Sequence, residues 1–147
     1  MPCAVVRESI DIHSLLNRGR HQAAGARILF CGDVRNHSEQ KEVIFLEYEA
    51  HESMALKKIH EIVASAEKKW PIHYVEVVHR LGKMEVTECS VAIVVSCSHR
   101  REAYEASRYI IDTIKHTVPI WKKEHFTDGT SSWSKGCEAC EIHEHET

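Results

Sequence analysis

The chain has 147 residues, about the size of one average domain, and its 43% of hydrophobic residues can bury a core without disulfides or metals. The formal net charge is -3 with histidine neutral, so no overall positive field would draw the chain to nucleic acid or an anionic membrane. Aromatic residues make up only 7%, which also argues against a stacking platform for nucleic acid.

The sequence also indicates a compartment. No apolar run approaches the ~20 residues that span a bilayer, and residues 1–8 become charged too early for a signal peptide. We therefore expect a cytoplasmic protein whose six cysteines are reduced thiols. Cys31, Cys89 and Cys97 stand in apolar runs, where a cysteine is expected to act as a small buried hydrophobe.

The first part of the chain alternates short β segments with one helix. Residues 3–8 and 26–32 are expected to be strands, and residues 10–22 between them carry an apolar face at helical spacing. A polar loop over 33–39 then precedes a β-branched and aromatic strand over 43–48.

Two long amphipathic helices are expected in the second part, over 52–69 and 99–116. Pro71 stops the first of them. The expected strands between and after these helices are 73–80, 83–86, 90–96 and an extended segment that opens at 118–121.

Helices and hairpin-connected strands therefore share one chain, which favours an α+β fold with a mostly antiparallel sheet over a doubly wound parallel sheet. No internal repeat or linker divides the chain, so residues 1–136 are expected to form a single domain. Residues 137–147 are polar and acidic and are expected to be a mobile tail.

The start of the second long helix is a candidate anion site. His99, Arg100 and Arg101 stand where the helix dipole and the unpaired backbone N–H groups already favour negative charge, a position that normally recruits acidic residues. A bound anion would relieve that conflict, because the N–H groups and the side chains would act together. The alternative is that these are solvated surface cations, with Ser98 as the helix cap.

Other cations are weaker candidates. Arg35 follows an apolar strand and could join a phosphate site if its loop came near the second helix, although loop arginines are usually solvated. Lys122 and Lys123 follow Trp121, and a lysine against an apolar wall and near other cations can act as an acid, base or nucleophile. The alternative is that Lys122 and Lys123 face solvent, as most pairs of charged residues do.

The tail carries a Cys-x-x-Cys-x-x-His-x-His pattern, formed by Cys137, Cys140, His143 and His145. This spacing can bind zinc, but it lacks the second half of a zinc-finger pattern and stands among acidic residues, so a plain tail is the competing interpretation. We expect no resident metal and no cofactor.

Five segments, in order along residues 25 to 133, resemble the large subunit of molybdopterin synthase. They read GARILFCGDVRNH (25–37), LEYEAHESMA (46–55), HRLG (79–82), VVSCSHR (94–100) and PIWKKE (119–124). The combination of His-Arg opening a helix and Pro-Ile-Trp-Lys-Lys-Glu following it is the most specific part of this resemblance.

The resemblance implies an α/β hammerhead-like fold and a dimer of this chain. It also implies that a small ubiquitin-like subunit docks at each end, which gives a heterotetramer. The C-terminal Gly-Gly of that partner, as a thiocarboxylate, would donate sulfur to cyclic pyranopterin monophosphate and so form the dithiolene of molybdopterin. The chain would then be a sulfurtransferase.

Residue by residue, the resemblance implies that Lys122 is the catalytic lysine, with Lys123 beside it. Arg35 matches a loop arginine that faces the substrate, and His99 and Arg100 match a pair that binds the pterin phosphate. A looser match implies substrate contacts from a short polar stretch: Thr130, Ser131 and Ser132.

The chain also departs from the family. Glu39 and Gln40 stand in a loop where the family often has Gly, and Thr87 stands where another Gly is common. Both departures fall in turns and leave the candidate site residues unchanged. Two other functions stay open: a non-catalytic scaffold or binding protein that keeps the fold, and a small metal-binding regulator built on the tail.

Overall fold

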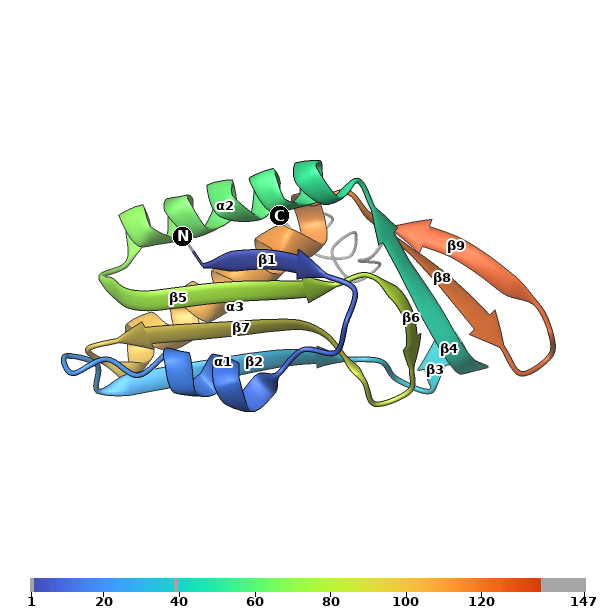
Figure 1. The fold of residues 1–147 in the computed structure, drawn as a ribbon, viewed down its shortest axis with the longest axis horizontal. Helices are drawn as coiled ribbons and strands as arrows, with labels where there is room; N and C mark the ends of the chain where they lie inside the picture. The colour runs from blue at the N-terminus through green and yellow to red at the C-terminus, as the bar shows by residue number, and fades with distance from the viewer. Residues whose placement is uncertain (1, 39, 136–147) are drawn as a thin grey trace.

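The structure is a computed structural model that describes residues 2–38 and 40–135, and Figure 1 shows its fold. The predicted tail, residues 137–147, lies outside the described residues. The elements in chain order are β1 (Cys3–Val6), α1 (Ile12–Arg18), β2 (Ala26–Asp33), β3 (His37–Ser38), β4 (Lys41–Ala50), α2 (Glu52–Lys69), β5 (Ile72–Arg80), β6 (Gly82–Glu85), β7 (Cys89–Cys97), α3 (Arg100–Thr117), β8 (Ile120–Phe126) and β9 (Ser131–Lys135).

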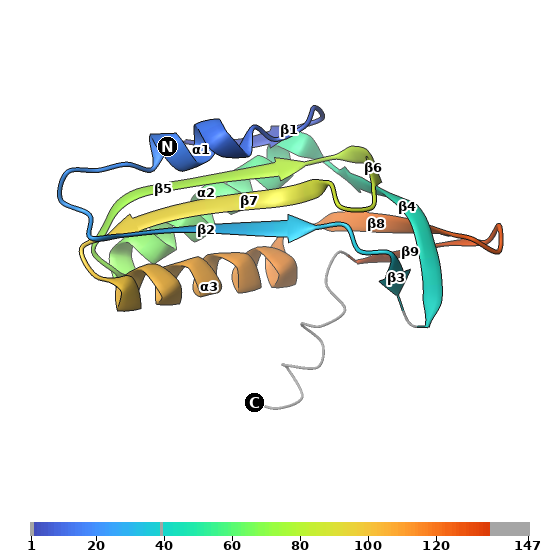
Figure 2. The same cartoon turned by 90° about the horizontal axis from the view of Figure 1, so that it is seen from below.

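A four-stranded sheet forms the centre of the molecule, in the order β1-β5-β7-β2. Only β1 and β5 are parallel; the other neighbours run antiparallel. The long helices α2 and α3 cover one face of this sheet, and the short helix α1 covers the other (Figures 1 and 2). The α+β class with mostly antiparallel strands is therefore confirmed.

Burial on both faces explains the composition of the central strands. β7 is buried along nearly its whole length, so it reads as a continuous apolar run rather than an alternating one. On α3, buried residues recur three and four positions apart, as Ala103, Ala106, Ile110 and Ile114. They meet fully buried α2 residues such as Ile59, which gives one core between helices and sheet.

A second sheet extends from the end of the first, with the order β3-β4-β8-β9 and with β6 also paired to β4. β4 leads into α2, and β8 follows α3 after Val118 and Pro119. The two long helices therefore bring β4 and β8 side by side, in a register that places Tyr48 opposite Lys122. This junction positions the candidate site.

The predicted helices and strands agree with the observed ones in number and order, with two additions. The first helix was predicted too long: residues 10–22 were expected to be helical, but α1 ends at Arg18, with Gly19 as its C-cap. β3 is a two-residue strand inside the predicted loop, too short to leave a periodic pattern. β9 is mostly polar, and its sequence did not indicate a strand; it forms by pairing with β8. Among the described residues, no helix is long and apolar enough to cross a membrane.

The two departures from the family fall on strained backbone. Gln40 has φ of 70° and Thr87 has φ of 79°, the left-handed region in which glycine is favoured. The turn at Thr87 is held by hydrogen bonds from its N–H to Val34 O at 2.8 Å and from Glu88 N–H to Glu85 O at 3.1 Å. A β-branched residue at this φ stores strain that glycine would not.

We predict that Thr87→Gly raises the free energy of unfolding by up to about 1 kcal/mol, because relief of the strain exceeds the entropy cost of glycine. Urea unfolding followed by circular dichroism measures the change. Thr127→Gly is the matched control: Thr127 is also an exposed turn residue, but its φ is not positive, so the same substitution should not stabilise the protein. Equal effects at both positions would disprove the strain.

Candidate functional site

Arg35 and Lys122 line one cavity at the junction of the two sheets. The cavity measures about 60 Å³, and its walls come from the segment after β2, from β4 and from β8. The lining residues are Asp33, Val34, Arg35, His37, Leu46, Tyr48, Lys122 and Glu124. Two of the cations singled out from the sequence, far apart along the chain, therefore share a site.

Glu124 is the acidic partner of this cavity. Alternation along β8 turns Lys122 and Glu124 to the same side, and Glu124 is buried, with 5% of its surface exposed. Lys122 Nζ lies 3.8 Å from Glu124 Oε1, and the Ser38 hydroxyl donates to the same oxygen at 3.1 Å. The carboxylate thus fixes the end of the Lys122 side chain, a role that the sequence did not reveal.

Lys115 is a second lysine at this site, and sequence reasoning missed it. It lies in the last turn of α3, and its Nζ is 5.6 Å from the centroid of the Tyr48 ring. Burial, and then the positive charge of Lys122, lower the pKa of Lys115 to about 8. The neutral amine is therefore accessible near physiological pH, as general acid–base chemistry requires.

The neutral imidazole of His79 lies behind Lys115. Lys115, Tyr48 and His79 line a narrow gap of about 10 Å³ between α3 and the two sheets. Burial, and then the charge of Lys115, lower the pKa of His79 to about 3, so the ring is uncharged at neutral pH. Its Nδ1 lies 3.0 Å from the Arg80 carbonyl oxygen, which fits an N–H donor at that nitrogen. The neutral ring adds no further positive charge beside Lys115.

Lys123 does not line this cavity. It faces the opposite side of β8, where its Nζ lies 5.6 Å from the centroid of the Trp133 ring. Strand alternation separates neighbouring side chains in this way. The sequence named both lysines, and the structure brings only Lys122 to Arg35.

His99 and Arg100 lie at the other end of α3 from Lys115. About 22 Å of helix separates Arg100 from Lys115, and Figure 2 shows the start of α3 beneath the beginning of β2, away from β4 and β8. Within one chain, the predicted phosphate pair therefore does not reach the Arg35–Lys122 cavity.

The cap of α3 also differs from the alternative considered for this helix. The N-cap is His99, without a side-chain cap hydrogen bond, so Ser98 is not the cap. Ser98 Oγ instead lies 2.8 Å from His73 Nε2. His99 and Arg100 are exposed, and the helix N-terminus beside them has no carboxylate cap. Glu102 lies in the first turn, so the local conflict of charge seen in the sequence is partly offset in the structure.

The polar stretch Thr130, Ser131 and Ser132 borders a separate cavity of about 200 Å³, which Glu124 also lines. This stretch lies beside the Arg35–Lys122 cavity, with the buried carboxylate between them. Thr130 is held by Asp128, whose carboxylate accepts from the Thr130 backbone N–H at 2.9 Å and from its hydroxyl at 2.5 Å.

Within residues 2–38 and 40–135, no cluster of three or more His, Cys, Asp or Glu side chains could hold a metal ion. The candidate zinc pattern of residues 137–147 lies outside that part of the chain. Cys97 is buried, and Cys31 and Cys89 are half-buried. Burial raises the pKa of all three thiols, that of Cys89 to about 12, so they stay protonated as expected of packed thiols.

Comparisons with known proteins agree on one family. The family model described as "MoaE protein" matches residues 5–117. The molybdopterin synthase catalytic subunit of Nostoc sp. (strain PCC 7120) is 44% identical over 124 residues, covering 84% of this chain and 73% of that protein. The subunit of the same name from Thermoplasma volcanium is 45% identical over 129 residues, covering 88% of this chain and 94% of that protein.

A solved structure shows the same fold. The crystal structure of molybdopterin synthase from Staphylococcus aureus superimposes with a TM-score of 0.84 at 37% identity, covering 89% of this chain and 95% of the matched chain.

The charge coupling between the two lysines is testable. We predict that Lys122→Ala raises the pKa of Lys115 above about 8, because the repelling charge is gone, but leaves it below the ordinary lysine value of about 10.4, because burial, the larger cause, remains. Lys122→Arg keeps the charge and should leave the pKa low. Titration of the Lys115 13Cε resonance by NMR measures both variants. A pKa that stays near 8 in Lys122→Ala would show that Lys122 does not contribute.

Proposed function

Because this chain belongs to the MoaE protein family, we propose that it is the catalytic subunit of a molybdopterin synthase. In this proposal, it transfers sulfur to cyclic pyranopterin monophosphate and so builds the molybdopterin dithiolene. The observation that carries the proposal is the cavity in which Arg35 and Lys122 meet, beside a lysine of lowered pKa. The relatives carry the words "catalytic subunit" in their names, which supports a role alongside a second chain.

The sulfur donor in this proposal is a small ubiquitin-like subunit. Its C-terminal Gly-Gly, as a thiocarboxylate, enters the cavity region from outside. Two copies of the present chain and two of the small subunit form a heterotetramer. The reactive sulfur is brought by the partner, so the chain itself supplies positioning, charge and proton transfer.

The dimer explains why the phosphate pair and the lysines stand at opposite ends of α3. His99 and Arg100 of one copy reach the Arg35–Lys122 cavity of the other, so each site is completed by two chains. The substrate phosphate is then held by guanidinium groups and by an α3 N-terminus. Two arginines can grip a phosphate with a bidentate geometry that lysine cannot copy.

Each sulfur transfer proceeds without oxidation or reduction. A lone pair of the thiocarboxylate sulfur forms a C–S bond to the substrate, and the bond from that carbon to oxygen breaks. In the first transfer, the released electron pair stays on the phosphate oxygen, which opens the cyclic phosphate. Water then cleaves the acyl C–S bond, so the carrier leaves as a carboxylate and the sulfur stays on the substrate. A second loaded carrier repeats the exchange at the neighbouring carbon, whose oxygen takes up protons and leaves as water.

Lys122 and Lys115 supply the charge and proton chemistry of these steps. Lys122, oriented by Glu124, stabilises the negative charge that develops on the departing oxygen. With a pKa of about 8, roughly a tenth of Lys115 is neutral at pH 7 and can accept a proton from the attacking water. Lys123 faces away from the cavity, so the proposal assigns it no proton transfer.

The scaffold alternative keeps the fold but needs none of this chemistry. A buried carboxylate paired with one lysine, near a second buried lysine, costs stability unless the charges are balanced, so a scaffold would gain nothing from keeping these residues. Lys122, Glu124 and Lys115 together therefore favour the catalytic proposal.

We predict that Lys122→Ala lowers turnover by about 100-fold or more, because charge stabilisation at the departing oxygen is lost. The assay mixes the purified chain with thiocarboxylated small subunit and substrate, and follows molybdopterin. Lys123→Ala is the matched control and should retain most activity. Size-exclusion chromatography checks that the complex with the small subunit persists. Normal turnover in Lys122→Ala would remove this lysine from the mechanism.

We predict that Arg100→Ala mainly weakens substrate affinity, by roughly 1.5–3 kcal/mol for one charge-assisted hydrogen bond to phosphate. Isothermal titration calorimetry with the substrate measures the loss. Arg101→Ala, on the adjacent exposed arginine that pairs with Glu105 at 3.6 Å, serves as the control. Unchanged affinity in Arg100→Ala would refute the phosphate role.

A further inference from the structure

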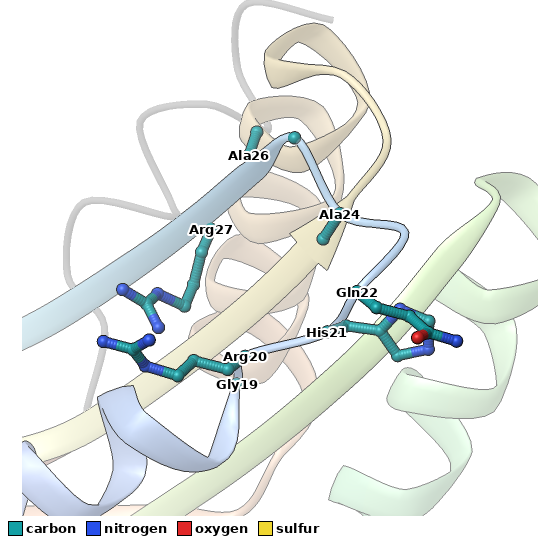
Figure 3. A pocket seen from close by; sticks show the side chains of 8 residues that line it. Gly19, Arg20, His21, Gln22, Ala24, Ala26 and Arg27 are labelled. Atoms are coloured by element: carbon teal, nitrogen blue, oxygen red, sulfur yellow. The ribbon is translucent and has the colours of Figure 1, made fainter.

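Within one chain, a larger cavity lies far from the Arg35–Lys122 site, where the chain passes from the end of α1 to the start of β2 (Figure 3). It measures about 610 Å³ and is wide open to solvent, with Arg20 and Arg27 both exposed. Its lining residues are Gly19, Arg20, His21, Gln22, Ala24, Gly25, Ala26 and Arg27. No carboxylate belongs to this lining.

Two arginines of this cavity point toward one another. Figure 3 shows the guanidinium groups of Arg20 and Arg27 facing each other from opposite walls. Neither has a hydrogen bond or ion pair with any residue of 2–38 or 40–135. The neighbouring Arg18 differs, because both oxygens of the buried Glu76 accept from it at 2.8 and 2.9 Å. The carboxylate of Glu76 is thus already paired with Arg18.

We propose that this cavity binds the phosphate group of a small soluble molecule, held between Arg20 and Arg27. Two facing guanidinium groups without a counter-charge from the described part of the chain repel one another, and a dianion between them converts that repulsion into two charge-assisted contacts. Guanidinium forks match the geometry of phosphate oxygens. The proposal does not depend on the function proposed above.

Glycine brings the two arginines together. A Cβ placed on Gly19 would lie 2.6 Å from Val94 Cγ2 and 3.3 Å from Arg27 Cδ, so a side chain there would force α1 away from the sheet. The Gly19 carbonyl also accepts a hydrogen bond from the Ser96 hydroxyl, on the strand that pairs with Arg27. Gly19 therefore sets the close approach of the Arg20 backbone to the Arg27 stem.

The end of the connection near Gly25 is also held in place by its contacts. Gly25 N–H donates to the Ser98 carbonyl at 3.2 Å, and a Cβ at Gly25 would lie 2.4 Å from that same oxygen. The His21 ring stacks on His73, with centroids 4.8 Å apart and planes 13° apart. The connection between α1 and β2 is therefore held at both ends, which limits the entropy lost when a ligand binds.

The charge distribution favours a small ligand over a polymer or a membrane. The chain carries a net charge of -3, and the lining offers two cations rather than a basic stripe. Nucleic acids and anionic bilayers are recognised by many cations spread over a surface. A single phosphate between two arginines, with the rest of the ligand in the remaining volume, fits this cavity better.

The test uses the full chain and two probes, inorganic phosphate and glycerol 3-phosphate, at constant ionic strength set with chloride. Arginine side-chain Nε–H resonances in NMR give a readout at each arginine, which separates this cavity from Arg35 and Arg100. We expect the Arg20 and Arg27 signals to shift together and saturate. Glycerol 3-phosphate should bind at least as tightly as phosphate, because the cavity holds more than the anion.

Matched variants complete the test by calorimetry. Arg20→Gln/Arg27→Gln should weaken binding by about tenfold or more, the loss expected when charge-assisted hydrogen bonds disappear. Arg101→Gln/Arg108→Gln removes the same charge from exposed positions on α3 and should change binding less than about twofold. Circular dichroism checks that each variant is folded. The proposal is overturned if Arg20 and Arg27 show no saturable shift, if both double variants weaken binding equally, or if only inorganic phosphate binds.

Discussion

The junction of the two sheets forces two ammonium groups and one carboxylate into a partly dry space. Lys115 comes from the last turn of α3, and Lys122 and Glu124 come from the strand that follows. Burial, and then the positive charge of Lys122, lower the pKa of Lys115. Glu124 is the buried carboxylate of the site and lies 3.8 Å from Lys122, so buried positive charge exceeds buried negative charge. Beneath them, burial, and then the charge of Lys115, lower the pKa of His79 and keep its ring neutral. This imbalance is a property of the fold, because α3 and β8 cannot separate without breaking the core around Ile114.

An imbalance of this kind is useful where anions must enter. The site carries more positive than negative charge, so it attracts anions such as a phosphate, a thiocarboxylate or a departing oxygen. Arg35 adds a guanidinium to the same cavity. The α3 helix then links two functional ends: its last turn carries Lys115, and its first carries Arg100. A symmetric pair of chains can use both ends without bending the helix.

Much of the fold could be predicted from periodicity. The stripes of α2 and α3 and the apolar run of β7 specify their own burial, so these elements were predicted closely. β9 could not be, because five mostly polar residues become a strand only through pairing with β8. The departures at Glu39–Gln40 and Thr87 were expected to affect turns, and the structure adds that Gln40 and Thr87 have left-handed backbone, which the sequence analysis did not predict.

The site was predicted only in part, for physical reasons. Arg35 and Lys122 were named from the sequence, and the fold brings them together. Lys115 was missed because a lysine in the last turn of a helix is also what the helix dipole favours on an ordinary surface. Burial by the second sheet distinguishes it, and no local pattern encodes that. Alternation along β8 separates Lys122 from Lys123, but the sequence alone did not say which faces inward.

The claim that each site is completed by two chains is tested most directly with mixed dimers. One chain carries Lys122→Ala and the other Arg100→Ala, and two different affinity tags isolate the mixed species. Each variant alone should be nearly inactive under limiting substrate. The account predicts that the mixed dimer regains about half of the wild-type activity, because one of its two sites then has an intact Lys122 and an intact Arg100. A mixed dimer as inactive as its parents would contradict it.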